Sequence, residues 1–255
     1  MTKKESHLLL KVNKTMELKN IIYQRKSVRK YTGKPVEQET VRKILDFCKQ
    51  AKPLNPDIRI EAKVVNREQV RFYLPWKTPQ LLAIFSEDKP GYLENVGFIF
   101  QQVELYLHSL GLGACWMGLG KFRKNEIPQI KGMEFVIFIA FGQPAEPLCR
   151  EPSDFSRKPL AEISDVEDTR LECARLAPSS TNSQPWYFTH EGDTIHAFCC
   201  EAGFLRHKLL GNMNRIDMGI ALVHLYLESQ DTFRFFTEEP KEIPKGYRYT
   251  GSITL

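Results

Sequence analysis

Long apolar runs are absent from this sequence. The longest, FVIFIAF at residues 135–141, is far shorter than the roughly 20 residues that a membrane helix needs. The N-terminal stretch MTKKESHLLLKVNKTMELKN lacks the apolar core and cleavage site of a signal peptide. The six cysteines form no CxxC pair, and the adjacent Cys199 and Cys200 suit neither a disulfide framework nor a zinc site. We therefore expect a cytoplasmic protein with reduced thiols, no metal and no membrane contact.

A strong excess of one charge is also missing. Lysine and arginine total 36 against 31 acidic residues, so the formal net charge is only +5, and the two signs are interleaved along most of the chain. A nucleic-acid-binding protein usually concentrates its basic residues in one patch or module. The densest basic stretch here is QRKSVRKYTGK at residues 24–34. A local anion site explains this stretch better than a nucleic-acid surface, and we expect no nucleic-acid partner.

With 255 residues, of which 42% are hydrophobic, the chain is long enough for one large domain or two closely packed halves. Apolar residues at helical spacing predict helices over residues 16–26, 37–49, 95–110, 166–176 and 216–227. Short apolar runs predict strands over residues 58–65, 80–85, 135–141, 186–190 and 194–199. The predicted class is α+β.

Two pairs of segments suggest internal repetition. CKQAKP and CARLAP share a cysteine and a proline 125 residues apart. NVGFIFQQVELYL and DMGIALVHLYLES share an Asn or Asp, an apolar residue and a glycine, which places Gly97 and Gly219 122 residues apart. Two similar offsets in the same order favour two α+β halves of common ancestry. We expect these halves at residues 16–155 and 156–255.

The segment QRKSVRKY places Arg25, Ser27 and Arg29 at alternate positions. On an extended or turning backbone, alternate side chains share one side. Two guanidinium groups beside a hydroxyl group would then form a phosphate receptor, because the planar arginine fork suits oxyanions. A solvated basic end of a helix would carry the same charges. The charge spacing alone favours this second interpretation.

The segment LAPSSTNSQPW offers several hydrogen-bonding side chains on a backbone stiffened by two prolines. It could bind the edge of a heteroaromatic ring, or it could be a turn that satisfies its own backbone. In SLGLGACWMGLGKF, at residues 109–122, the glycines could end a helix or let the backbone approach a planar ligand closely. These glycines follow the helix, so the segment is not a Rossmann fingerprint.

Taken together, RKSVRKYTGKPV, APSSTNSQPWYF and LGLGACWMG resemble the signature segments of nitroreductase-like FMN flavoproteins. FGQPAEP and SRKPLAEI are similar to two further pieces of that family. The resemblance implies a nitroreductase-like fold. Typical members are homodimers that hold the flavin at the interface, and their APSxxNxQPW loop follows the first helices. This sequence has AKPLNPDIRI at that place, and its full loop stands in the second half.

This departure in order implies a fused pseudo-dimer with long central helices and one FMN per chain. The first half would supply the phosphate grip and the glycine-rich segment, and the second half would supply the loop of a partner subunit. Carried over by resemblance, the FMN phosphate would be bound by Arg25 and Ser27, with a late contact from Arg157 or Lys158. Arg29 would lie near the pyrimidine edge of the flavin, and Lys26 has a less defined place beside it.

The same resemblance assigns the ring contacts. One side of the flavin would meet Met117, Gly118 and Leu119 of the glycine-rich segment. Some members carry a glutamate at the Gly118 position. The ring and the ribityl chain would meet the loop of the other half through Pro178, Ser179, Ser180 and Asn182, with Gln184 in the same loop. No catalytic protein base is required, because the hydride chemistry belongs to the cofactor.

The resemblance implies an FMN-dependent NAD(P)H oxidoreductase with a ping-pong cycle, whose acceptor is a nitroaromatic, a quinone or an unknown small molecule. The protein would work as a monomer or a weak homodimer. Two alternatives remain at this point. One is a non-catalytic FMN-binding protein that stores or senses flavin, and the other is a degenerate scaffold without flavin.

Overall fold

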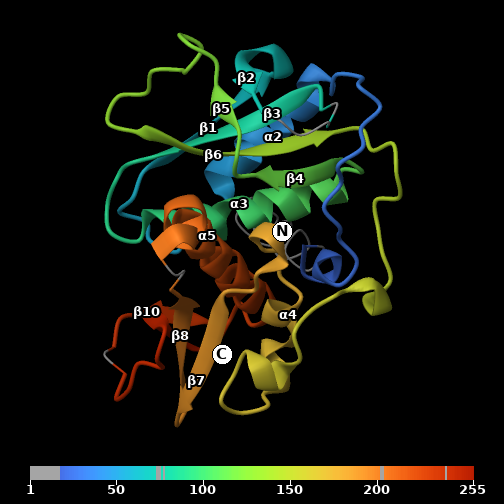
Figure 1. Cartoon of the computed structure of the whole chain (residues 1–255). Helices are drawn as coiled ribbons and strands as arrows, with labels where there is room; N and C mark the ends of the chain where they lie inside the picture. Colours follow the sequence, from blue (N-terminus) through green and yellow to red (C-terminus); the bar gives the residue numbers. More distant parts are fainter. Residues whose placement is uncertain (1–17, 73–75, 77, 202–203, 239) are drawn as a thin grey trace, which may run out of the picture.

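The computed structural model describes residues 18–72, 76, 78–201, 204–238 and 240–255, with the backbone alone for residues 204–211. Within these residues the chain forms two four-stranded antiparallel sheets, and two long helices lie between them (Figure 1). A short ribbon of β2 (Val70–Arg71) and β5 (Lys121–Phe122) accompanies the first sheet. No helix of the described part combines the length and apolarity needed to cross a bilayer.

The first sheet has the order β1-β3-β6-β4. Its elements follow a helical turn at residues 18–22 and comprise α2 (Gln38–Gln50), β1 (Ile60–Asn66), β3 (Gln80–Ser86), α3 (Tyr92–Ser109), β4 (Gly113–Met117) and β6 (Glu134–Gly142). The second sheet has the order β7-β8-β10-β9. Its elements comprise α4 (Glu172–Arg175), β7 (Trp186–Glu191), β8 (Thr194–Cys200), α5 (Phe204–Glu228), β9 (Arg234–Phe236) and β10 (Tyr247–Thr254).

The two sheets have the same topology. In each, two strands precede the long helix and two follow it, the pairing is antiparallel throughout, and the fourth strand in the chain pairs with the second. The 3₁₀ turns are Arg67–Gln69 in the first part, and Pro152–Asp154, Leu160–Glu162, Thr169–Leu171 and Ser180–Asn182 later.

Strand β3 shows how the sequence pattern forms the core, because all seven of its residues are buried. Alternate side chains of a strand enter opposite faces of the sheet. Leu82 and Ile84 therefore join the larger core, which contains α3, while Leu81 and Phe85 join a smaller core on the other face. Each such side chain contributes roughly 1.5–3 kcal/mol on burial. A central strand covered on both faces reads as a continuous apolar run, as this one does.

Helices α3 and α5 pack against each other through Gly97 and Gly219. A Cβ atom on Gly97 would lie 2.0 Å from the carbonyl oxygen of Ile216, and one on Gly219 would lie 1.9 Å from that of Glu94. Each glycine therefore faces a carbonyl group of the other helix, and that carbonyl group belongs to the residue three positions before the other glycine. The two helices meet backbone to backbone at this crossing, and only glycine fits there.

All five predicted strands and the helices at residues 37–49 and 95–110 are confirmed, with no end more than three residues from its predicted position. The predicted helix at residues 216–227 is the second half of α5, which begins at Phe204. The predicted helix at residues 16–26 is too long. The chain is helical at residues 18–22, it leaves the helix before Arg25, and residues 16–17 lie outside the described part.

The predicted helix at residues 166–176 is wrong over most of its length, since only Glu172–Arg175 is α-helical. The carboxylate of Asp168 accepts hydrogen bonds from the backbone of Arg170 and from the ring of His190. These bonds favour a capped 3₁₀ turn tied to β7 over a regular helix. The glycine-rich segment also differs from a plain helix-ending loop, because Gly113–Met117 forms strand β4, paired with β6.

Candidate functional site

Two neighbouring cavities lie between the first part of the chain and the loop at residues 178–184. The first has a volume of about 530 Å³ and the second of about 330 Å³. The two cavities share five lining residues and therefore adjoin: Ser27, Arg29, Pro178, Ser179 and Thr181. One continuous site thus has a polar end and an apolar end.

Cations dominate the first cavity, which we call the cationic cavity. Five basic side chains line it, namely Arg25, Lys26, Arg29, Arg150 and Arg157. The acidic residue among its lining residues is Asp154. Such a group of charges attracts an anion, and guanidinium groups suit a phosphate through bidentate hydrogen bonds.

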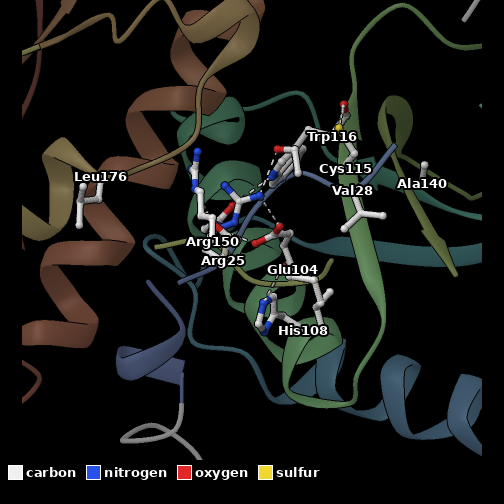
Figure 2. Close-up of polar contacts among 12 residues, drawn as sticks. Arg25, Val28, Glu104, His108, Cys115, Trp116, Ala140, Arg150 and Leu176 are labelled. Carbon is white, nitrogen blue, oxygen red and sulfur yellow. Dashed lines mark hydrogen bonds and ion pairs between the residues drawn. The ribbon is translucent and has the colours of Figure 1, made fainter. Parts of the chain in front are cut away.

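Arg25 is committed to a buried ion pair. Its guanidinium lies 2.9 Å from Oε1 of Glu104 on α3, and both side chains are almost fully buried. The same terminal nitrogen of Arg25 donates to the hydroxyl oxygen of Ser27. Burial raises the pKa of Glu104 and the guanidinium of Arg25 opposes this rise. Figure 2 shows Arg25 between Glu104 on one side and Arg150 on the other. The charge of Arg25 is therefore largely offset from behind the cavity.

Arg150 is positioned by two contacts that leave its terminal nitrogens for a ligand. Its Nε donates to the carbonyl oxygen of Arg25 at 3.0 Å, and its guanidinium lies 3.6 Å from the centre of the Phe155 ring. No carboxylate forms an ion pair with it in the part of the chain that the structure describes. Burial, together with the nearby Arg25, lowers the pKa of Arg150 to about 10. A half-buried cation without an ion-pair partner is typical of an anion site.

Arg157 both lines the cationic cavity and holds the loop. Its Nε donates to the carbonyl oxygen of Ala177, and its terminal nitrogens donate to Asn182 Oδ1 at 2.7 Å and to the carbonyl oxygen of Leu176. Burial, and then the charges of Arg150 and Arg25, lower the pKa of Arg157 to about 10. One side chain thus fixes the second part of the chain beside the cations of the first.

The loop at residues 178–184 is held in an unusual conformation. Thr181, Asn182 and Gln184 have positive φ angles of 53°, 57° and 48°. Such backbone is uncommon outside glycine and persists where surrounding contacts fix it. Ser180 N donates to Asp217 Oδ2, Gln184 N donates to Ser179 Oγ, and Arg157 holds Asn182. The loop is therefore a preformed wall of both cavities.

The second cavity, which we call the apolar cavity, is lined mainly by carbon and sulfur. Strand β4 contributes Cys115, Trp116 and Met117 from one side, and α5 contributes Met213, Ile216, Asp217 and Ile220 from the other. Arg29 and Trp76 are also part of its wall, with the guanidinium carbon of Arg29 5.8 Å from the ring centre of Trp76. A slot between a strand and a helix, with few polar groups, suits a flat aromatic ligand.

Gly118 and Leu119 stand at the edge of this slot. A Cβ atom on Gly118 would lie 2.4 Å from the terminal carbon of Met213, so a larger residue here would have to displace that methionine. Leu119 is 62% exposed, unusually high for a leucine. The glutamate that some nitroreductase-like proteins carry at the Gly118 position would thus meet Met213 in this chain.

The structure brings together twelve of the fourteen residues that the sequence predicts for the site. The cationic cavity contains Arg25, Lys26, Ser27, Arg29, Arg157, Pro178, Ser179 and Asn182, and the apolar cavity adds Met117, Gly118, Leu119 and Ser180. Lys158 and Gln184 line neither cavity. The backbone N–H of Lys158 instead donates to Gln184 Oε1, so the pair joins the loop to the preceding segment.

Several lining residues were not predicted. Arg150 lies in CREPSD, which carries no recognisable motif, and it reaches the site through a backbone pairing of Arg25 with Cys149. Asp217 and Met213 belong to α5, where the sequence indicates only a long apolar helix. For Asp217 a signal was present, since a carboxylate at the start of an apolar helix face is uncommon in a core.

Residues 17–229 match the model of the family described as "Putative TM nitroreductase", and the chain belongs to this family. The crystal structure of a "putative nitroreductase" from Thermotoga maritima is 20% identical and covers 94% of each chain, with a TM-score of 0.62. The two proteins share this mixed α/β fold. No curated protein matches the chain.

Smaller solved structures also align with this chain. A nitroreductase family protein from Clostridium difficile is 18% identical, covers 59% of this chain and 98% of its own, and has a TM-score of 0.45. An FMN-dependent nitroreductase from Clostridium difficile R20291 is 19% identical, covers 53% of this chain and 95% of its own, and has a TM-score of 0.41.

Proposed function

We propose that this chain binds FMN across the two joined cavities and is an NAD(P)H oxidoreductase of the nitroreductase type. The observation that carries the proposal is the continuity of a cationic cavity with an apolar slot. FMN has the same two ends, a phosphate group and a flat ring system. Family membership and the FMN-dependent nitroreductase among the aligned structures support the same cofactor.

The charges of the cationic cavity fit a phosphate monoester. Glu104 offsets Arg25, and Glu146 lies 3.9 Å from Lys26. The remaining charges are three guanidinium groups, Arg29, Arg150 and Arg157, and the carboxylate of Asp154. Their net charge of +2 balances the charge of roughly −1.5 to −2 that a phosphate monoester carries near pH 7. Riboflavin, which lacks the phosphate, would leave this charge uncompensated.

In the proposed site the phosphate is held by Arg150 and Arg157 with the hydroxyl of Ser27, and the ring system lies in the apolar cavity. Bound FMN would supply hydride transfer from NAD(P)H to a small acceptor, for which we propose a nitroaromatic or a quinone. The chain's own part is binding, orientation and exclusion of water. The fixed cation of Arg29 between the two cavities favours negative charge on a reduced ligand.

We also propose that the chain is a fused pseudo-dimer of two halves, residues 16–155 and 156–255, that arose by internal duplication. Three observations support it: the identical strand order of the two sheets, the reciprocal contacts of Gly97 and Gly219, and a cavity wall contributed from both halves. Because one chain supplies both walls of the site, it would work as a monomer or a weak homodimer.

The absorption spectrum of the purified protein tests the proposal. We expect a yellow protein with about one FMN per chain, bleached without oxygen by NADH or NADPH. A yellow protein that neither nucleotide bleaches would favour a flavin store or sensor. A colourless protein that stays colourless after incubation with FMN would refute the flavin site and favour a scaffold without cofactor.

A further inference from the structure

Asp217 is a buried acid in the wall of the apolar cavity. It lies on α5, its side chain is only 4% exposed, and it is the carboxylate among the described lining residues of that cavity. Its Oδ2 atom accepts a hydrogen bond from Ser180 N at 3.0 Å. This hydrogen bond supports the loop at residues 178–184 and gives Asp217 a structural role.

The first half of the chain performs the same task with an amide. Asn95 lies 122 residues before Asp217 and at the same distance from its helix glycine. Its Oδ1 atom accepts from Leu54 N and Asn55 N, and its Nδ2 donates to the carbonyl oxygen of Asn55. Fixing a loop to this helix position therefore requires no carboxyl group. The carboxyl group occurs in the half whose helix position borders the apolar cavity.

The surroundings of Asp217 favour its neutral form. Burial raises the pKa of Asp217 to about 8, and the hydrogen bond from Ser180 N opposes this only in part. The other titratable groups in the wall of this cavity are Arg29 and Cys115, and Cys199 on β8 interacts electrostatically with Asp217. No ion pair joins Asp217 to a cation in the described chain. At neutral pH the carboxyl group thus keeps its proton and offers an O–H donor beside an apolar slot.

We propose that Asp217 contacts the ring system bound in the apolar cavity as a neutral acid and donates a hydrogen bond to an acceptor atom of that ring. Binding of the ring and protonation of Asp217 are then coupled. The inference rests on the proposed flavin site and adds a residue that binds the ring through a proton. An ionised Asp217 would present negative charge to the acceptor atoms of the ring and would have no proton to donate.

Riboflavin is the probe that isolates this effect, because it has the ring system of FMN without a phosphate that titrates. Its dissociation constant is measured by flavin fluorescence between pH 6 and pH 9 on the cofactor-free full-length protein. If only the neutral form of Asp217 binds, the wild-type constant is flat below pH 7 and about tenfold weaker at pH 9. Carboxyl NMR of the same samples should show the pKa of Asp217 rising when riboflavin binds.

Asp217→Asn is the informative variant, since its amide keeps an acceptor for Ser180 N and a donor for the ring. At pH 6 we expect it to bind riboflavin about as tightly as the wild type does. At pH 9 we expect its affinity for riboflavin to be the same as its own affinity at pH 6. Asp193→Asn, in the exposed turn between β7 and β8, is the matched control and should keep the wild-type profile.

A flat wild-type profile, or the same bend in Asp217→Asn as in the wild type, would overturn the role of Asp217 and leave the flavin site intact. The absence of both FMN and riboflavin binding at every pH would instead refute the proposed function, and this inference with it.

Discussion

The crossing of α3 and α5 gives a prediction whose sign separates two physical effects. Gly97→Ala removes a glycine from the interior of a helix, and helix propensity alone would stabilise the fold by roughly 0.5–1 kcal/mol. The new Cβ atom would lie 2.0 Å from the carbonyl oxygen of Ile216. Real contacts of this kind lie beyond 3.0 Å, so backbone must separate from backbone by about 1 Å or more along a closely packed helix pair.

Such overpacking typically lowers the free energy of unfolding by about 1–3 kcal/mol, and rigid backbone at this crossing places the effect at the upper end. After the propensity gain, we expect Gly97→Ala to destabilise the protein by about 2 kcal/mol. At this chain length the midpoint of thermal unfolding should fall by roughly 4–8 °C. Gly219→Ala should behave alike, because its Cβ would meet the carbonyl oxygen of Glu94 at 1.9 Å.

Differential scanning calorimetry and urea titration of the two variants provide the measurement. Ser109→Ala, at the half-buried last residue of α3, is the control for a change of helix propensity away from the crossing. An unchanged or raised midpoint for both glycine variants would mean that the two helices do not meet backbone to backbone at Gly97 and Gly219.

Three further predictions concern the site. Arg150→Ala should weaken FMN binding roughly 10- to 100-fold, which is equivalent to about 1.5–3 kcal/mol for charge-assisted hydrogen bonds. The affinity for riboflavin should stay unchanged, and equal losses for both ligands would contradict a role of Arg150 in binding the phosphate. Arg25→Ala should lower the free energy of unfolding by about 3–5 kcal/mol, because it leaves the Glu104 carboxylate buried without its counter-ion. Arg25→Met with Glu104→Leu should restore much of this stability, and equal urea midpoints for the single and double variants would refute the prediction. Asp217→Asn should gain stability relative to the wild type as pH rises from about 4 to 8, by about 1.4 kcal/mol per pH unit at most, because the folded wild type keeps a proton on Asp217 that the unfolded wild type releases above pH 4. Urea unfolding curves at pH 5 and pH 8 check this, and a difference in stability between variant and wild type that stays the same at both pH values would exclude the raised pKa.

Much of the fold is predictable because its elements are locally consistent. The apolar run of β3 and the apolar length of α3 already specify buried elements, and both are found where expected. Residues 166–176 show the opposite case. Their helical spacing is outweighed by hydrogen bonds between Asp168 and His190, which is 22 residues away in sequence. Periodicity carries no information about such a bond. Strand β9 was missed because it has only three residues, and β10 was missed because Ile253 is its only aliphatic residue.

The residues of the site also divide into those that local sequence predicts and those that depend on contacts between distant segments. The residue types at positions 25–29 and 178–182 indicate a binding site, and the two segments do meet at the cavities. The partner of Arg25 could not be predicted, because Glu104 lies 79 residues later on a helix whose spacing suggests only a core. Arg150 was missed for a related reason. Its position depends on the backbone of Arg25, a contact between segments 125 residues apart.

The two helix positions 122 residues apart connect the fold with the site. At Asn95 the helix holds the loop of the first half by an amide whose donor and acceptor are both used within the protein. At Asp217 the helix holds the corresponding loop by one oxygen, and the same side chain borders a cavity. The bonds of the neutral amide are those of a structural role, whereas a buried acid brings a desolvation penalty that a purely structural role would not require. In the proposed pseudo-dimer, the difference between these two side chains would therefore be a chemical reason for the two halves to differ in function while the two sheets share a topology.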